Sequence, residues 1–200
     1  DHRRRGSARG RNGWQVLKVI RSRSERNARE RAMSKQFYAP LSTSIGWIGV
    51  LASDKGLRRL VLPKPSAEQV VEDLWPETND ADLAPARFRH FQKQLEEYLS
   101  GDAMGFNLEL DMEGYSDFFS KAWAACNSIP RGQTRSYAWL AAQAGNPRAI
   151  RAAGQAMARN PVPIIIPCHR VIGTDGKLHG YGGGLGLKKH LLDLEQSASV

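Results

Sequence analysis

The stretch SYAWLAAQAGNPRAIRAAGQAMARNPVPIIIPCHRVIG, residues 136–173, decides the fold of the second half of this chain. It opens with two short Ala-rich runs, 137–146 and 147–160, which meet at a Gly-Asn-Pro turn. Two such runs favour a pair of helices joined by a tight turn, which is the form of a helix-turn-helix. An ordinary helical hairpin explains the same pattern, and the residues alone leave both interpretations open.

An apolar run follows the second helix and ends at a cysteine. Prolines at 161, 163 and 167 brace residues 164–166, and Cys168, His169 and Arg170 come directly after. We interpret the braced run as a rigid strand that delivers the cysteine. A cysteine reacts as its thiolate, so the adjacent histidine can act as its base, directly or through a water, and the arginine adds favourable positive charge.

Two features downstream extend this candidate site. Glu195, at the end of the predicted helix 187–195, can orient the histidine and complete a Cys/His/acid arrangement. The run GYGGGLG, residues 180–186, does not match a dinucleotide-binding fingerprint and predicts a loop whose exposed N–H groups can line a pocket. A buried structural cysteine and the nucleophile of a thiol hydrolase stay open as alternatives, although no protease signature accompanies Cys168.

The second predicted helix carries arginines among small residues. Arg148, Arg151 and Arg159 alternate with residues such as Ala152 and Gly154. A slim helix with protruding arginines fits a DNA groove, because small side chains allow a close approach and the arginine reaches inward. A tight contact between two helices explains the pattern equally well.

Charge is unevenly distributed along the chain. The formal net charge of +9 divides into +8 for residues 1–32, −5 for 33–113 and +6 for 114–200. A basic second half is the footprint of a nucleic-acid binder, and ordinary surface charge is the alternative. Residues 1–32, rich in Arg, Ser and Gly, predict a disordered basic extension outside the fold. A transit peptide and a non-specific DNA-binding arm are the other interpretations of that segment.

The number of cysteines and the hydropathy of the chain restrict the classes of protein that this sequence fits. No apolar stretch is long enough to span a membrane, and nothing resembles a secretory signal. The two cysteines, Cys126 and Cys168, therefore predict a reduced, intracellular protein rather than a disulfide scaffold. Cys126 falls in the predicted helix 117–129, where a small buried hydrophobic role is expected.

Residues 33–113 form a small α/β unit without a catalytic pattern. The runs 45–52 and 57–63 predict strands around a turn, and 105–112 alternates as a further strand. Ser66 with Gln69 is a capping-box pattern for a helix over 66–75, and apolar spacing predicts another helix over 86–101. The segment 111–116 is the best candidate for a domain boundary.

From about Phe118 to Glu195 the sequence closely resembles the O6-alkylguanine-DNA alkyltransferases, also called methylated-DNA–protein-cysteine methyltransferases, whose PCHR signature stands at 167–170. The resemblance implies an α/β N-terminal domain over 33–113, with a small antiparallel sheet and helices in a ribonuclease H-like arrangement. It implies a mainly α C-terminal domain over 114–200, a winged helix-turn-helix that binds DNA and accepts the alkyl group.

The resemblance also implies a reaction, which is DNA repair by direct reversal. The alkyl group of O6-alkylguanine, with O4-alkylthymine as a second candidate substrate, moves irreversibly to Cys168, once per molecule. His169 takes the thiol proton through a water, Glu195 is its carboxylate partner, and Tyr137 donates to the departing base. A non-catalytic marker or regulator that binds alkylated DNA is the alternative function.

Further site residues follow from the resemblance. Arg151 fills the space of a flipped base, and the other residues of the expected DNA surface are Arg148, Arg159, Ala152, Gly154 and Arg135. Asn160 ties the recognition helix to the active-site segment. The expected lid and pocket residues are Tyr181, Gly182, Gly183, Pro167 and Arg170. A small polar residue often follows the lid tyrosine in relatives, so Gly182 bears on lid stiffness and substrate range.

The expected partner is double-stranded DNA that contains O6-alkylguanine, bound by a monomer in the cytoplasm near the nucleoid. No cofactor is expected, because the lesion itself supplies the alkyl group. No metal site is expected either, since residues 33–113 contain no cysteine and His90 as their only histidine.

Overall fold

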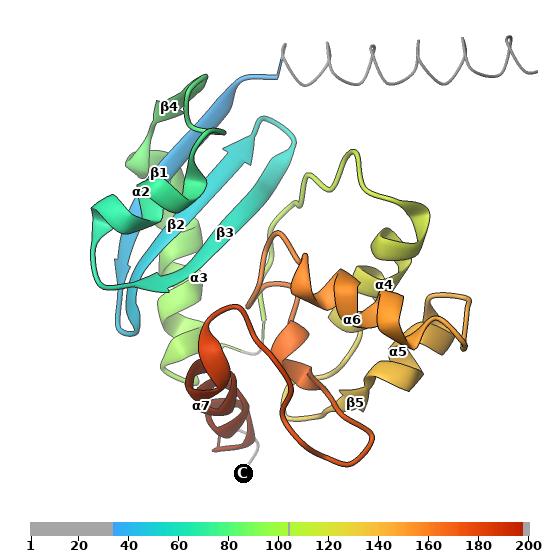
Figure 1. Cartoon of the computed structure of the whole chain (residues 1–200). Coiled ribbons are helices and arrows are strands. Elements are labelled where there is room, and N and C mark those ends of the chain that lie inside the picture. Colours follow the sequence, from blue (N-terminus) through green and yellow to red (C-terminus); the bar gives the residue numbers. More distant parts are fainter. Residues whose placement is uncertain (1–33, 104, 198–200) are drawn as a thin grey trace, which may run out of the picture. The chain divides into compact units, whose positions relative to one another are not determined.

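Three consecutive strands form the sheet of the first half of the protein. In the computed structural model, which describes residues 34–103 and 105–197, these are β1 (Gln36–Thr43), β2 (Gly46–Ser53) and β3 (Gly56–Lys64) (Figure 1). They pair antiparallel, and β2 and β3 correspond to the strands predicted over 45–52 and 57–63. The short β4 (Ala81–Leu83) completes the order β3-β2-β1-β4 and pairs parallel with β1. The implied antiparallel sheet therefore also contains one parallel pair, because the chain between β3 and β4 crosses over to the far edge of the sheet.

The predicted strand over 105–112 is also absent from the described residues. This segment makes one isolated bridge, between Leu57 and Leu110, with backbone hydrogen bonds at Leu57 that are 2.9 Å long on both sides. The contact is close, since a Cβ on Gly56 would lie 2.5 Å from the Glu109 carbonyl oxygen. Further along the same edge, β3 pairs with another segment: the Leu60 N–H donates to the Pro161 carbonyl at 2.8 Å.

Two helices complete the first half. Helix α2 (Ala67–Leu74) begins at Ser66, whose hydroxyl accepts the Gln69 N–H, which confirms the predicted cap. A short 3-10 turn, η1 (Pro85–Phe88), leads into α3 (Arg89–Leu99). Helix α3 buries the apolar positions that defined it in the sequence, and Tyr98 is fully enclosed.

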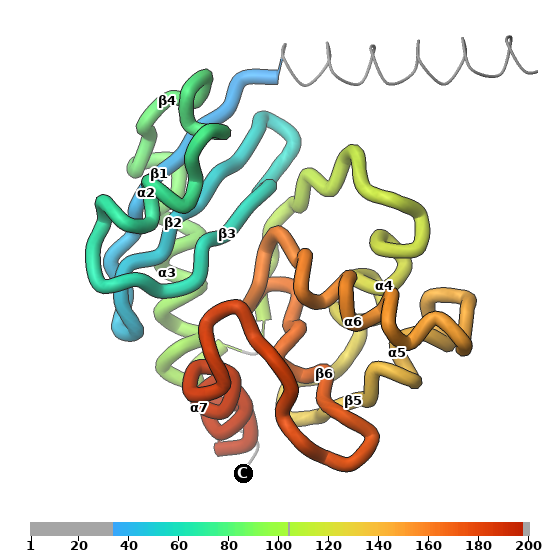
Figure 2. Tube along the Cα trace, viewed as in Figure 1, coloured from blue at the N-terminus to red at the C-terminus, as the bar shows by residue number. Residues whose placement is uncertain are grey.

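The second half is helical, with α4 (Asp117–Asn127), α5 (Tyr137–Gln143), α6 (Ile150–Ala158) and α7 (Gly184–Ser197). A two-stranded parallel pair, β5 (Arg135–Ser136) and β6 (Val171–Ile172), lies among them. Helices α5 and α6 pack side by side (Figure 2). Helix α6 begins later than predicted, because Asn146 holds residues 147–149 in a turn: its carbonyl accepts the Ala149 N–H at 2.9 Å.

One hydrophobic core runs through both halves. It joins Phe37 and Ile48 of the sheet with Trp123 of α4 and Leu140 of α5. The described residues from Gln36 onward form one compact unit, so the division near residue 113 stays a prediction. The predicted extension over residues 1–32 lies outside the described residues. No helix of the described part is long and apolar enough to cross a membrane.

Candidate functional site

The segment that delivers Cys168 is a turn, so the predicted strand over 164–166 is wrong. The Ile166 N–H donates to the Val162 carbonyl at 3.0 Å, and Pro163 bridges Ile166. Prolines lack the N–H that a strand ladder needs, which explains why a braced apolar run folds back on itself here. Cys168 then opens a short 3-10 turn, η2 (Cys168–Arg170).

Asn160 fixes this turn from the end of α6. Its side-chain amide donates to the Ile166 carbonyl at 2.8 Å, and its Oδ1 accepts the Val162 N–H at 3.1 Å. Within the turn, Ile164 has a φ of 74°, which is unfavourable for a β-branched residue. A backbone conformation of this kind costs about 1–3 kcal/mol and persists only where the surroundings impose it. The hydrogen bonds of Asn160 are therefore part of what places Cys168.

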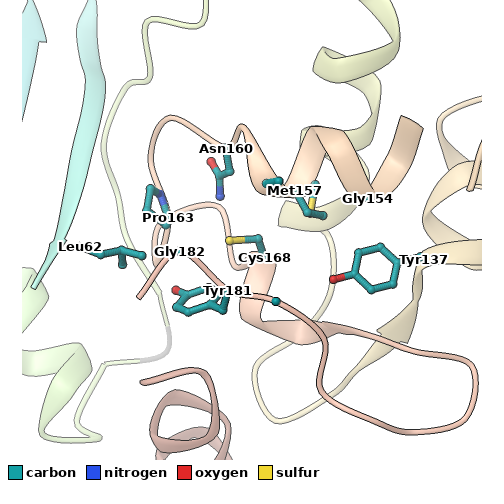
Figure 3. A pocket seen from close by; sticks show the side chains of 11 residues that line it. Leu62, Tyr137, Gly154, Met157, Asn160, Pro163, Cys168, Tyr181 and Gly182 are labelled. Carbon is teal, nitrogen blue, oxygen red and sulfur yellow. The ribbon is translucent and has the colours of Figure 1, made fainter. Parts of the chain in front are cut away.

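Cys168 lies in the wall of a cavity of about 270 Å³ (Figure 3). The wall comes from β3, α5, α6, the Asn160–Cys168 segment and the glycine-rich loop. It consists of Leu62, Tyr137, Gly154, Met157, Ala158, Asn160, Pro163, Cys168, Gly180, Tyr181 and Gly182. In Figure 3 the Tyr137 hydroxyl points toward the centre of this ring of side chains. The cavity brings together the cysteine, the phenol and the lid that the sequence predicted far apart along the chain.

The Cys168 thiol is protonated at rest. Burial raises its pKa, and the Asn160 side chain, the charge of Lys188 and nearby backbone N–H groups offset that effect only in part. A reaction of this thiol as a nucleophile therefore needs a base.

His169 is suited to that role. It is completely buried, and its Nε2 lies 2.8 Å from Glu195 Oε1. Burial lowers the pKa of His169, although the Glu195 carboxylate raises it, so the imidazole is neutral near pH 7. With Nε2–H assigned as the donor to Glu195, Nδ1 is the free base position, and it has no hydrogen-bond partner in the described chain.

Besides the contact with His169, Glu195 accepts hydrogen bonds from Arg170, Gly132 and Tyr98. The Arg170 Nε and Nη2 groups donate to it at 2.9 and 2.8 Å, the Gly132 N–H donates at 3.2 Å, and the Tyr98 hydroxyl makes a short hydrogen bond to Oε1. Burial raises the pKa of this carboxyl, but the hydrogen bonds from His169, Arg170 and Tyr98 outweigh it and hold the pKa far below its usual range. Glu195 is therefore a permanent anion beneath the histidine.

The sequence analysis missed several residues of the site, and Tyr98, Leu62 and Lys188 are the most informative of them. Tyr98 belongs to α3, distant in sequence from Glu195, and Leu62 belongs to β3. Lys188 is fully buried, and its ammonium group donates to the Val171 carbonyl at 2.8 Å. A signal for Lys188 was present, because it shares the buried face of α7 with Leu191, Leu192 and Glu195 at helical spacing. No sequence signal connects Tyr98 or Leu62 to the cysteine.

The residues predicted to contact DNA divide into two groups. Arg148 is exposed in the turn before α6, Arg151 is exposed in the first turn of the helix, and Gly154 of α6 lines the cavity. Ala152 is half-buried on this helix. The other two arginines pack on aromatic rings outside the cavity: Arg159 lies 5.9 Å from the Phe119 ring centre, and Arg135 lies 5.8 Å from that of Trp139.

The remaining predicted residues lie around the cysteine. Pro167 directly precedes it and is buried, and Tyr181 and Gly182 contribute to the cavity wall. Gly183 is not one of the residues that line the cavity, and a Cβ there would meet the Leu187 side chain at 2.5 Å. In the described ranges, no group of three or more His, Cys, Asp or Glu side chains is placed to hold a metal ion.

Comparison with known proteins gives a consistent set of relatives. Residues 117–197 match the family model described as 6-O-methylguanine DNA methyltransferase, DNA binding domain. A Methanosarcina acetivorans protein named methylated-DNA–protein-cysteine methyltransferase is 41% identical over 161 residues, which cover 80% of this chain and 99% of the relative.

Solved structures agree with these sequence relatives. The crystal structure of Mycobacterium tuberculosis O6-methylguanine methyltransferase has a TM-score of 0.71 at 38% identity, with 82% of this chain and 95% of that one covered. A structure of Mycobacterium tuberculosis OGT in complex with DNA has a TM-score of 0.69 at 39% identity, with coverage of 81% and 94%.

Proposed function

The chain belongs to the methylated-DNA–protein-cysteine methyltransferase family, and from this premise we propose that Cys168 is its alkyl acceptor. The protein repairs DNA by moving an alkyl group from the DNA to one of its own cysteines. The observation that carries the assignment is the position of Cys168 in the cavity wall beside Tyr137 and Tyr181. Cys126, in contrast, is completely enclosed in α4, where burial raises its pKa well above the ordinary value.

Proton removal falls to His169. Its neutral Nδ1 takes the thiol proton, directly or through one water, and the imidazolium that forms is stabilised by Glu195. Because Arg170 and Tyr98 hold Glu195 as an anion, the proton stays on the histidine rather than moving on to the carboxylate. Arg170 and Tyr98 are thus positioning residues that act through Glu195.

The transfer itself is a single displacement. The thiolate attacks the alkyl carbon, the S–C bond forms as the C–O6 bond breaks, and the electron pair of that bond stays with guanine. Tyr137 donates a hydrogen bond or its proton to the departing base, which stabilises the negative charge that develops there. In the net reaction the thiol proton ends on guanine and the alkyl group ends on sulfur. The thioether is stable, so each molecule acts once.

The target base must leave the helix stack to reach this cavity. An O6 substituent inside a duplex is inaccessible to in-line attack, so we assign base flipping to this protein, with O6-alkylguanine in double-stranded DNA as its substrate. We propose that Arg151 occupies the vacated space, which its exposure on α6, three residues before the cavity-lining Gly154, supports. We further propose that the protein acts as a monomer.

The finer architecture follows the same proposal. The pairing of α5 with α6 through a tight turn supports a helix-turn-helix, with the short β5–β6 pair in the position of a wing. The strand order β3-β2-β1-β4, with β4 parallel to β1, supports a ribonuclease H-like first half. A role as a non-catalytic marker of alkylated DNA is the second candidate function, but the base at His169 and the reactive position of Cys168 favour transfer.

Two matched variants test the acceptor assignment. A duplex with one O6-[³H-methyl]guanine is mixed with wild type, Cys168→Ala and Cys126→Ala, and radioactivity on the protein is counted. We expect label on wild type and on Cys126→Ala, and none on Cys168→Ala, which should still bind the duplex. Label that persists on Cys168→Ala would overturn the assignment.

A further inference from the structure

Helix α6 starts with an exposed apolar side chain. Ile150, its first residue, is 45% exposed, in a helix whose other large apolar side chain, Met157, is 7% exposed. Single exposed apolar residues are common on protein surfaces, so exposure by itself carries no meaning. The exposure of Ile150 becomes informative because of where this residue lies relative to the cavity.

Ile150 lies on the stripe of α6 that leads into the cavity. Residues four apart on a helix share a face, so Ile150, Gly154 and Ala158 form one row. Gly154 and Ala158 line the cavity that holds Cys168. A Cβ built on Gly154 would meet no atom within 4 Å, so no other part of the described chain covers this face of α6 at Gly154. Ile150 therefore stands at the outer end of the α6 wall, about 6 Å along the axis from Gly154.

The surroundings of Ile150 suit a DNA backbone and base step. Arg148 and Arg151, both exposed, flank it and can hold phosphates or enter the groove. The start of α6 is fixed, since the Arg148 N–H donates to Asn146 Oδ1 at 3.2 Å. A β-branched side chain at a helix start has few rotamers, so Ile150 is a rigid apolar projection, and two exposed arginines lie within two residues of it in the sequence.

We propose that Ile150 is an apolar wedge that presses on the base step next to the flipped nucleotide. When the lesion base enters the cavity, the base that was stacked on it stays in the duplex at the rim of the cavity. There Ile150 contacts the exposed face of that neighbouring base and shields the opened base step from water. Apolar wedges of this kind unstack base steps in other DNA-bending proteins. The inference rests on the proposed function, and it concerns the opening of the duplex rather than the chemistry at Cys168.

The test separates opening from chemistry with two substrates. Transfer rates are measured for wild type, Ile150→Ala and Ile150→Leu, on a duplex with O6-methylguanine and on the free base O6-benzylguanine, which needs no flipping. Leu83→Ala is the matched control, since Leu83 is 60% exposed on β4 and remote from α6. A 2-aminopurine placed next to the lesion reports unstacking by its fluorescence when each protein binds.

We expect Ile150→Ala to slow duplex transfer roughly three- to tenfold, equivalent to about 0.7–1.4 kcal/mol, and to reduce the fluorescence rise. Ile150→Leu should recover most of both, and free-base transfer should be unchanged. The inference is overturned if Ile150→Ala matches Leu83→Ala on the duplex, or if free-base transfer falls equally. Either result leaves the proposed function intact as long as wild type transfers to Cys168, whereas failure of wild type itself refutes that function.

Discussion

The buried pair of Glu195 and Arg170 allows a quantitative prediction. Glu195 is fully enclosed and Arg170 is 7% exposed, and two guanidinium nitrogens donate to the carboxylate. The change Glu195→Gln keeps the shape but leaves the Arg170 charge buried without a counterion. Removing one partner of a buried ion pair costs about 3–5 kcal/mol. We therefore expect the free energy of unfolding to fall by about that amount.

The double variant Glu195→Gln/Arg170→Met provides the internal check. With the cation gone, most of the loss should be recovered, because replacing both members of a buried pair by neutral groups is often close to neutral. Asp193→Asn is the control on the same helix: its ion pair with Lys189 is exposed, and such pairs contribute about 0.2–1 kcal/mol.

Urea unfolding followed by tryptophan fluorescence measures all of these variants. Trp123, buried in α4, is a reporter of the shared core. A loss below about 1 kcal/mol for Glu195→Gln, similar to an exposed pair, would refute the reasoning. So would a double variant that is no more stable than the single one, because the penalty would then not arise from the uncompensated arginine.

Four further predictions concern the same site. Burial lowers the pKa of His169, so the folded state favours the neutral imidazole. The free energy of unfolding should therefore fall as the pH drops below about 6.5, where the unfolded chain binds the proton more readily. The variant His169→Gln should flatten this part of a plot of melting temperature against pH. Tyr98→Phe should slow transfer from free O6-benzylguanine several-fold and shift its pH profile, while Glu195 keeps its other donors; an unchanged profile would assign Tyr98 a packing role only. Asn160→Ala should release the turn that contains Ile164 and cost about 2 kcal/mol or more of unfolding free energy, with slower transfer; retention of both would contradict its positioning role. Leu62→Ala enlarges the cavity and should raise the ratio of benzyl to methyl transfer rates, and a constant ratio would remove Leu62 from the substrate wall.

Local patterns predicted the helices well. The predicted cap at Ser66 accepts the Gln69 N–H, and Ser116 and Ser136, which were not singled out in the sequence, cap α4 and α5 in the same way. Capping and periodicity act within one or two turns of chain, so they can be read without tertiary information. The Cys168, His169 and Glu195 arrangement could be predicted from the chemistry of these residue types, and the match to a family signature then assigned each residue its role.

Features that depend on distant partners could not be predicted. Tyr98 reaches Glu195 only because α3 and α7 meet in space, and Leu62 reaches the cavity only because the edge of β3 binds Pro161. The apolar alternation of 105–112 was misleading, since β3 offers it a partner only near Leu57. The isoleucines before Cys168 have high strand propensity, but the prolines and Asn160 override it with a turn.

Intact mass spectrometry tests the central claim most directly. The protein is incubated with excess duplex that contains one O6-methylguanine, and its mass is followed to completion before peptide mapping. The account predicts a mass increase of one methyl group per chain, located on Cys168 and never exceeded however much duplex is added. A protein that binds the lesion duplex but gains no mass, or gains it at another residue, would contradict the account.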